Sequence, residues 1–218
     1  MYTVDVRQLH RDLIEVHGRP NKSYSEDGVR QLLTTILSQN VADIQTARAS
    51  ENLFSAYRDY KAMEEADQDE LADVISDVGL MNQKSKRIQR SLRYITEETG
   101  GEYTLAFLDE MDTDDAQEWL TDIKGVGPKT ANVVLNFHFE KPTFAVDTHI
   151  ERLSKRFGLI SESTTADKAH DVLNNKIPDD IKYSLHVLLI AHGKQYCSAQ
   201  TPDCENLVCK KYCRCESC

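Results

Sequence analysis

The chain has 218 residues, of which 40% are hydrophobic and 28% are charged, so its composition excludes a long disordered protein. The formal net charge of -10 excludes a protein that wraps nucleic acid through overall positive charge, although it permits a basic face. No apolar run approaches about 18 residues, and the start MYTVDVRQLHRD is charged, which predicts neither a membrane span nor an export signal. We therefore expect a cytoplasmic protein that makes no membrane contact.

Apolar residues recur at helical spacing along most of the chain, and this predicts an all-α fold. Alternation with period two, which is typical of strands, is not found. Gly79, Gly100 and Gly158 directly follow helical patterns and are expected to end helices. In chain order, the predicted helices are centred on residues 29–37, 44–57, 71–78, 88–95, 116–123, 133–137, 150–157, 169–173 and 181–189.

One predicted connection has an unusual composition. Residues 123–130 read IKGVGPKT, so Gly125 and Gly127 flank one apolar residue and Pro128 opens the next helix. Glycine permits positive φ and close backbone approach, and proline is tolerated in the first turn of a helix. This order predicts a tight hairpin whose backbone N–H groups face outward at a helix N-terminus, which suits a phosphate. An ordinary helix–helix turn is the alternative.

All the cysteines cluster at one end of the chain. Clustering in a cytoplasmic protein favours thiolates that converge on one metal centre, because disulfide frameworks spread cysteines through small secreted folds. Four thiolates bind either a tetrahedral zinc ion or an iron–sulfur cluster, and spacing alone does not separate the two. Adventitious disulfides are the remaining alternative. The six residues are Cys197, Cys204, Cys209, Cys213, Cys215 and Cys218.

Taken together, these motifs resemble those of the endonuclease III family, the helix-hairpin-helix DNA glycosylases of base-excision repair. The longest match is IKGVGPKTANVVLNFHFEKPTFAVDTHIERL at 123–153, followed by ILSQNVADIQT at 36–46, DVGLMNQKSKRI at 77–88 and AHGKQYC at 191–197. The resemblance implies a two-lobed helical fold. A six-helix lobe over residues 28–141 would contain the hairpin, and residues 1–27 with 142–218 would form a second lobe that ends in the cysteine cluster.

The resemblance assigns the chemistry to two residues, Lys129 as the nucleophile and Asp147 as the carboxylate. A neutral amine can capture C1′ of the sugar and become a Schiff base, while a carboxylate can take its proton and stabilise an oxocarbenium-like centre. By position alone, Lys129 is a solvated surface lysine and Asp147 a helix N-cap. The lysine implies a bifunctional enzyme that removes oxidised pyrimidines and then nicks the strand by β-elimination as an abasic-site lyase.

The resemblance also implies binding to double-stranded DNA that holds a damaged base or an abasic site. Flipping a base leaves a gap in the stack. Asn40 aligns with the residue that fills this gap, where the family usually has Gln, and a slip of one position would place Gln39 there. Leu80 aligns with an apolar wedge, with core packing as its alternative. The expected DNA contacts are Gln39, Asn40, Leu80, Gly125, Gly127, Thr130 and His149.

Basic residues are expected to form one DNA-facing surface, although solvated helix faces would look the same. They follow Leu80, follow Asp147 and surround the cysteines. The residues concerned are Lys84, Lys86, Arg87, Arg90, Lys124, Arg152, Lys155, Arg156, Lys194, Lys210, Lys211 and Arg214.

The cysteine spacing departs from the family pattern C-x6-C-x2-C-x5-C, which holds a [4Fe-4S] cluster. The x6 step is kept, but Leu207 occupies the place of the third cysteine. The expected ligands are Cys197, Cys204, Cys209 and Cys213. A second set keeps the x5 step with Cys209 and Cys215, and Cys218 can compete. Zinc is the alternative metal. The cluster is expected to pin a loop and to take no redox part in base removal.

Two other functions fit the same sequence. One is a monofunctional glycosylase for uracil or thymine mismatches. The other is a non-catalytic helix-hairpin-helix DNA-binding module with a structural metal, which would need neither Lys129 nor Asp147. In each case a monomer is expected, and the setting is the cytoplasm, in association with the nucleoid.

Overall fold

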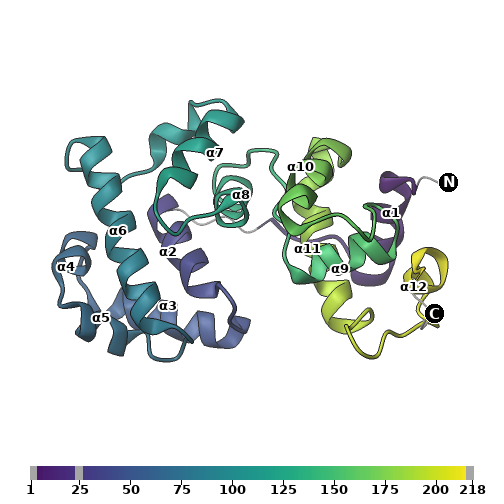
Figure 1. Ribbon diagram of the computed structural model, residues 1–218, viewed down its shortest axis with the longest axis horizontal. Coiled ribbons are helices and arrows are strands. Elements are labelled where there is room, and N and C mark those ends of the chain that lie inside the picture. The colour runs from purple at the N-terminus through teal and green to yellow at the C-terminus, as the bar shows by residue number, and fades with distance from the viewer. Residues whose placement is uncertain (1–3, 23–26, 215–218) are drawn as a thin grey trace. The chain divides into compact units, whose positions relative to one another are not determined.

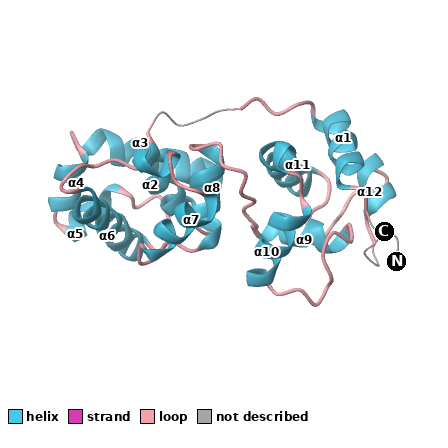
Figure 2. Ribbon diagram, turned by 90° about the horizontal axis from the view of Figure 1, so that it is seen from above, coloured by secondary structure: helices cyan, strands magenta, loops and turns pink. Residues whose placement is uncertain are grey.

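The all-α prediction is confirmed by the computed structural model, which describes residues 4–22 and 27–214 (Figure 1, Figure 2). In these ranges the backbone is helical apart from its loops, and one isolated β-bridge pairs Cys197 with Pro202. No helix of the described ranges is long and apolar enough to cross a membrane. The chain forms two compact units. The hairpin unit is Tyr24–Lys141, and the cysteine unit is Met1–Ser23 with Pro142–Cys218.

The hairpin unit is built around α2, which contacts α3, α6 and α8. The predicted apolar stripe of α2 is fully buried at Leu32, Leu33, Ile36 and Leu37. Asp27 starts this helix, because its carboxylate accepts hydrogen bonds from the first turn of the backbone. The elements of this unit are α2 (Gly28–Ser38), α3 (Asp43–Ala56), α4 (Tyr60–Glu65), α5 (Gln68–Val74), α6 (Met81–Thr99), the 3-10 turn η1 (Ala106–Asp109), α7 (Thr113–Asp122) and α8 (Pro128–Phe137).

The cysteine unit has its own core, in which α11 packs against α1 and α9. Leu185, Leu188 and Leu189 of α11 are buried there, at the positions that the sequence pattern marked as apolar. The elements of this unit are α1 (Val6–His17), α9 (Thr148–Arg156), α10 (Ala166–Lys176), the 3-10 turn η2 (Asp179–Ile181), α11 (Lys182–Gln195) and α12 (Leu207–Tyr212). The short helices α4 and α12 were not predicted, because each is too short to show a helical period.

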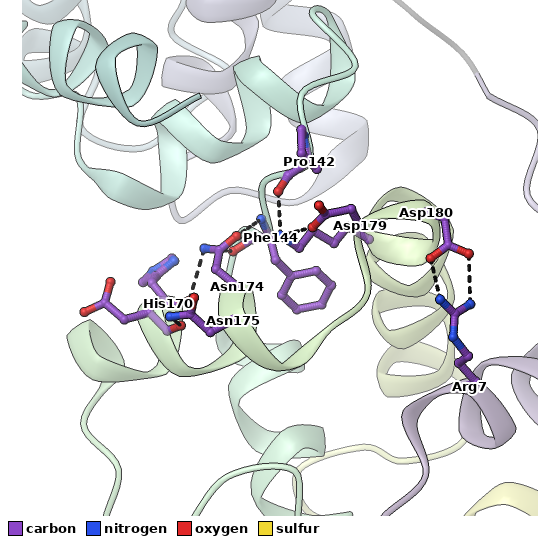
Figure 3. A network of polar contacts seen from close by, with 10 residues as sticks. Arg7, Pro142, Phe144, His170, Asn174, Asn175, Asp179 and Asp180 are labelled. Carbon is purple, nitrogen blue, oxygen red and sulfur yellow. Dashed lines mark hydrogen bonds and ion pairs between the residues drawn. The ribbon is translucent and has the colours of Figure 1, made fainter. Parts of the chain in front are cut away.

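A non-helical segment enters α9, and side chains satisfy its backbone (Figure 3). The Asn174 side chain accepts from Phe144 N at 2.7 Å and donates to Phe144 O at 3.4 Å. Lys182 Nζ donates to Pro142 O at 2.6 Å. These contacts replace the hydrogen bonds of a helix or sheet, because buried backbone groups need partners. The segment therefore delivers Asp147 to the start of α9 on a fixed path.

A buried lysine joins α6 to α2 in the hairpin unit. Lys84 is 1% exposed, and its Nζ donates to Leu37 O at 2.7 Å, in the last turn of α2. A cation is favoured at this end of a helix, where carbonyl groups lack intrahelical partners. Burial, with a smaller contribution from Arg87, lowers the pKa of Lys84 from 10.5 to about 8. Between these two pH values the unfolded chain therefore binds more protons than the folded one.

Stability should consequently rise with pH in this window, because a buried ammonium is disfavoured while it remains charged. We expect the free energy of unfolding of the wild type to increase by about 1.5 kcal/mol more than that of Lys84→Met between pH 8 and pH 9.5. Urea unfolding at several pH values measures the difference. Lys86→Met, an exposed neighbour, is the control and should keep the wild-type slope. Equal slopes for the wild type and Lys84→Met would contradict the assignment.

Candidate functional site

The glycine-containing connection forms the predicted hairpin between α7 and α8, which lie side by side (Figure 1). Val126 N donates to Ile123 O at 2.9 Å, and both of these side chains are buried. Gly125 has φ 104°, in the left-handed region that favours glycine. A Cβ on Gly125 would also lie 2.9 Å from Cγ of Arg87. Glycine is therefore required at this position both by its conformation and by its neighbour.

Lys129 is the second residue of α8 and follows the hairpin directly. Its side chain is exposed, and no described residue pairs with it by a hydrogen bond or an ion pair. Thr130 behind it is buried. An exposed primary amine in the first turn of a helix can reach a ligand that binds at the helix N-terminus. The chemistry that the arrangement permits is nucleophilic attack.

Asp147 is the N-cap of α9, and its Oδ1 accepts from Ile150 N at 2.7 Å. The capping role that the sequence suggested is therefore present. Nearby, His149 Nδ1 lies 3.1 Å from Arg152 Nη2, and Arg152 also donates to Gly193 O at 3.0 Å. Burial lowers the pKa of Arg152, whereas the Cys197 and Asp147 charges oppose that change. Lys129 belongs to the hairpin unit and Asp147 to the cysteine unit.

Two loops of the hairpin unit expose left-handed residues that the resemblance assigns to DNA. Asn40 has φ 56° and is exposed at the loop after α2. Leu80 has φ 60° and is 56% exposed at the start of α6, so the core-packing alternative for Leu80 is wrong. The loop before α6 is also attached to α3, because Gln45 Nε2 donates to Asp77 O at 3.1 Å. Gln39 differs from Asn40, since its side chain is engaged within the unit.

The prediction that the basic residues form one DNA-facing surface is wrong for Lys84, and two others are engaged in contacts within the protein. Lys84 is buried, as described above. Arg156 donates to Ser198 O at 2.6 Å and to Cys197 Sγ at 3.2 Å. Lys211 Nζ lies 2.6 Å from Asp12 Oδ2. Arg156 and Lys211 thus make contacts within the cysteine unit. The exposed side chains of Lys86, Arg90 and Lys124, in contrast, make no hydrogen bond or ion pair within the described part of the chain.

The structure brings together part of the expected cysteine ligand set. Cys197 and Cys209 are buried and in contact, and Cys213 is half-buried. Cys197 and Cys209 are not in disulfide bonds, whereas Cys204 is disulfide-bonded in this structure. No group of three or more side chains placed to hold a metal ion occurs within the described ranges. Burial, with contributions from Cys197 and Cys213, raises the pKa of Cys209 to about 12, so its thiolate needs a cation beside it.

The surroundings of these thiols include residues that sequence reasoning missed. His192 is buried with Nε2 3.3 Å from Cys209 Sγ, and its Nδ1 lies 3.1 Å from His17 Nε2. Burial lowers the pKa of His192 to about 4, so its ring is neutral. Asp12 of α1 accepts from Tyr212 Oη at 2.6 Å, which fastens α12 to α1. The AHGKQYC motif marked this region, but nothing in the sequence pointed to α1.

Comparisons with known proteins agree with the family resemblance of the sequence motifs. Residues 33–179 match the family described as HhH-GPD superfamily base excision DNA repair protein. Endonuclease III of Thermotoga maritima is 33% identical over 208 residues, which cover 95% of this chain and 92% of that protein. Endonuclease III of Bacillus subtilis is 35% identical over 188 residues, which cover 84% of this chain and 79% of that protein.

Solved structures agree. The protein in a structure of a non-covalent endonuclease III–DNA complex superposes with a TM-score of 0.82 at 27% identity, covering 96% of this chain and 94% of that one. A thermostable thymine-DNA glycosylase has the same fold, with a TM-score of 0.76 at 18% identity and coverage of 95% and 94%.

Proposed function

We infer that the chain is a base-excision repair DNA glycosylase and lyase, because it belongs to the endonuclease III family within the HhH-GPD superfamily. We propose further that it acts on double-stranded DNA, removes oxidised pyrimidines and nicks the strand at the resulting abasic site. The observation that carries this proposal is Lys129, an exposed lysine in the first turn of α8, directly after the hairpin. A monofunctional glycosylase or a DNA-binding module would not need it.

The proposed reaction has two stages. The Lys129 amine attacks C1′, the bond from C1′ to the damaged base breaks, and the base leaves with its electron pair and takes up a proton. The attacking amine loses a proton to the Asp147 carboxylate. The bond from C1′ to O4′ then breaks as O4′ takes up that proton, and a protonated imine links Nζ to C1′. Loss of a proton from C2′ then breaks the bond from C3′ to its phosphate oxygen. Water finally hydrolyses the imine and releases the lysine.

The DNA contacts are proposed from the backbone N–H groups of the hairpin and from the exposure of side chains. Gly125 and Gly127 would present backbone N–H groups to a phosphate, together with the N-terminus of α8, because this end of a helix favours anions. Asn40 would fill the gap left by the flipped base, and Leu80 would wedge beside it. Both side chains are exposed, and both residues have a left-handed backbone conformation. His149, held by Arg152, would contact the flipped nucleotide.

We propose a [4Fe-4S] cluster on Cys197, Cys204, Cys209 and Cys213. Two of these thiols already meet in a buried place, and Arg156 donates to one of them. Binding would require reduction of Cys204, which is disulfide-bonded in the structure. When bound, the cluster would supply a structural cross-link between α11, α12 and the loop that joins them. The reaction above uses no electron from it.

Borohydride reduction tests the nucleophile. On a duplex with one oxidised pyrimidine, the wild type should form a covalent protein–DNA adduct, because reduction converts the imine into a stable amine. Lys129→Ala should form none, while Lys124→Ala, an exposed lysine on the other side of the hairpin, should trap like the wild type. Denaturing electrophoresis separates the adduct from free DNA. An undiminished adduct in Lys129→Ala would contradict the role of this residue.

Asp147→Asn separates chemistry from capping. Asparagine caps helices as well as aspartate, so the thermal midpoint should hardly change. The rate of base release should fall by at least about 100-fold, since asparagine cannot accept the proton. Single-turnover assays of base release and thermal unfolding measure the two effects. A variant that turns over near the wild-type rate would remove Asp147 from the mechanism.

The metal is tested on freshly purified protein. We expect a broad visible absorption together with bound iron and sulfide, all of which should be lost in Cys209→Ser. Cys218→Ser should keep them, because this cysteine is outside the proposed ligand set. Colourless protein with stoichiometric zinc would contradict the cluster, since zinc has a filled d shell and no visible band.

A further inference from the structure

Three side chains of the hairpin unit link three separate segments around Lys129. Gln39, in the loop after α2, donates from Nε2 to Thr130 Oγ1 at 3.1 Å. Arg87 of α6 donates from Nη1 to Gln39 Oε1. Both ends of the Gln39 amide are therefore occupied within the protein. These links join residues that are 91 and 48 positions apart in the chain.

The same arginine also touches the hairpin. The place that a Cβ on Gly125 would take lies 2.9 Å from Cγ and 3.1 Å from Cδ of Arg87. The aliphatic part of this side chain therefore packs on the turn four residues before Lys129. Its guanidinium reaches, through Gln39, the residue directly after Lys129. Arg87 thus packs directly on the hairpin before Lys129 and is linked, through Gln39, to the side chain of the residue after it.

The loop that carries Asn40 is anchored by the same helix. Lys84 lies one turn before Arg87 and donates to Leu37 O at 2.7 Å. Arg87 donates to the side chain of Gln39, two residues after Leu37. Beyond these two anchors the chain turns sharply, and Asn40 adopts φ 56° with an exposed side chain. Gln39 is the last anchored residue, and Asn40 is the first one that projects outward.

We propose that Arg87 is a positioning residue that acts through Gln39 and Thr130. It holds the loop of Asn40 and the first turn of α8 in one arrangement, so that filling the gap in the DNA and presenting the Lys129 amine occur together. The inference rests on the proposed function, because it takes the roles of Asn40 and Lys129 from there. It also assigns Gln39 to the relay and leaves the gap-filling role to Asn40 alone.

Isosteric changes test the relay. Gln39→Met and Thr130→Val keep side-chain size but remove the hydrogen bonds, and the double variant completes a cycle. We expect each single variant to lower the single-turnover rate of imine trapping by about 10- to 100-fold, because small misplacement of a reacting group has costs of this size. The dissociation constant for lesion DNA should change by less than about threefold. The double variant should be no slower than the slower single variant, because both remove one linkage.

Two further variants supply controls. Gln39→Glu should keep the rate within about twofold, because the Thr130 hydroxyl can donate to a carboxylate that also pairs with Arg87. Glu97→Gln, at an exposed position on α6 outside the expected DNA-facing surface, should leave both the rate and the affinity unchanged. Thermal unfolding verifies that every variant is folded.

The outcomes distinguish the proposed glycosylase and lyase function from the relay through Gln39. No trapping by the wild type would overturn the proposed function. Normal trapping by the wild type with unchanged rates in Gln39→Met and Thr130→Val would overturn the relay alone. Additive rate losses, or losses that appear only in the dissociation constant, would also overturn it.

Discussion

The site depends on one constraint, the left-handed turn at Gly125 that lets α8 begin directly after α7. Only glycine tolerates both φ 104° and the side chain of Arg87 packed against it. Pro128 is the first residue of α8. Its missing N–H costs no hydrogen bond, since the first N–H groups of a helix have no intrahelical partner. As a result, Lys129 lies within the first helical turn, where its neighbours are unpaired N–H groups. Without this turn, Lys129 would not lie at the N-terminus of a helix.

Each compact unit places its candidate residue, Lys129 or Asp147, at a helix N-terminus, and different contacts do so in the two units. In the hairpin unit, buried Ile123 and Val126 fix the turn, and Thr130 anchors the helix behind Lys129. In the cysteine unit, Asn174 holds the segment that leads to Asp147, which then caps α9 with one carboxylate oxygen. The cap uses Oδ1 and orients the carboxylate, so a structural role and a chemical role are compatible in one residue. The fold thus supplies rigid elements on which a loop-borne reaction can depend.

Much of this architecture could be predicted from the spacing of apolar residues and from the residue types that begin or end helices. The stripe of α2 and the hairpin at Gly125 followed from spacing and from residue type, and the cap at Asp147 followed from its place before an apolar helix. Roles that arise from tertiary contact could not be predicted. Lysine is usually exposed, so the burial of Lys84 against a helix terminus had no local signal. The contact of Arg87 with Gln39 joins segments far apart in the chain, where the sequence showed only a basic residue and a polar one.

The central claim is that one amine, that of Lys129, bonds to the sugar of the damaged nucleotide. The most direct measurement is to trap the wild-type adduct with borohydride, digest the protein and the DNA, and locate the modified peptide by mass spectrometry. The account predicts that the remnant of the sugar is attached to Nζ of Lys129 and to no other amine. Attachment to Lys124, or to the amino terminus, would contradict it.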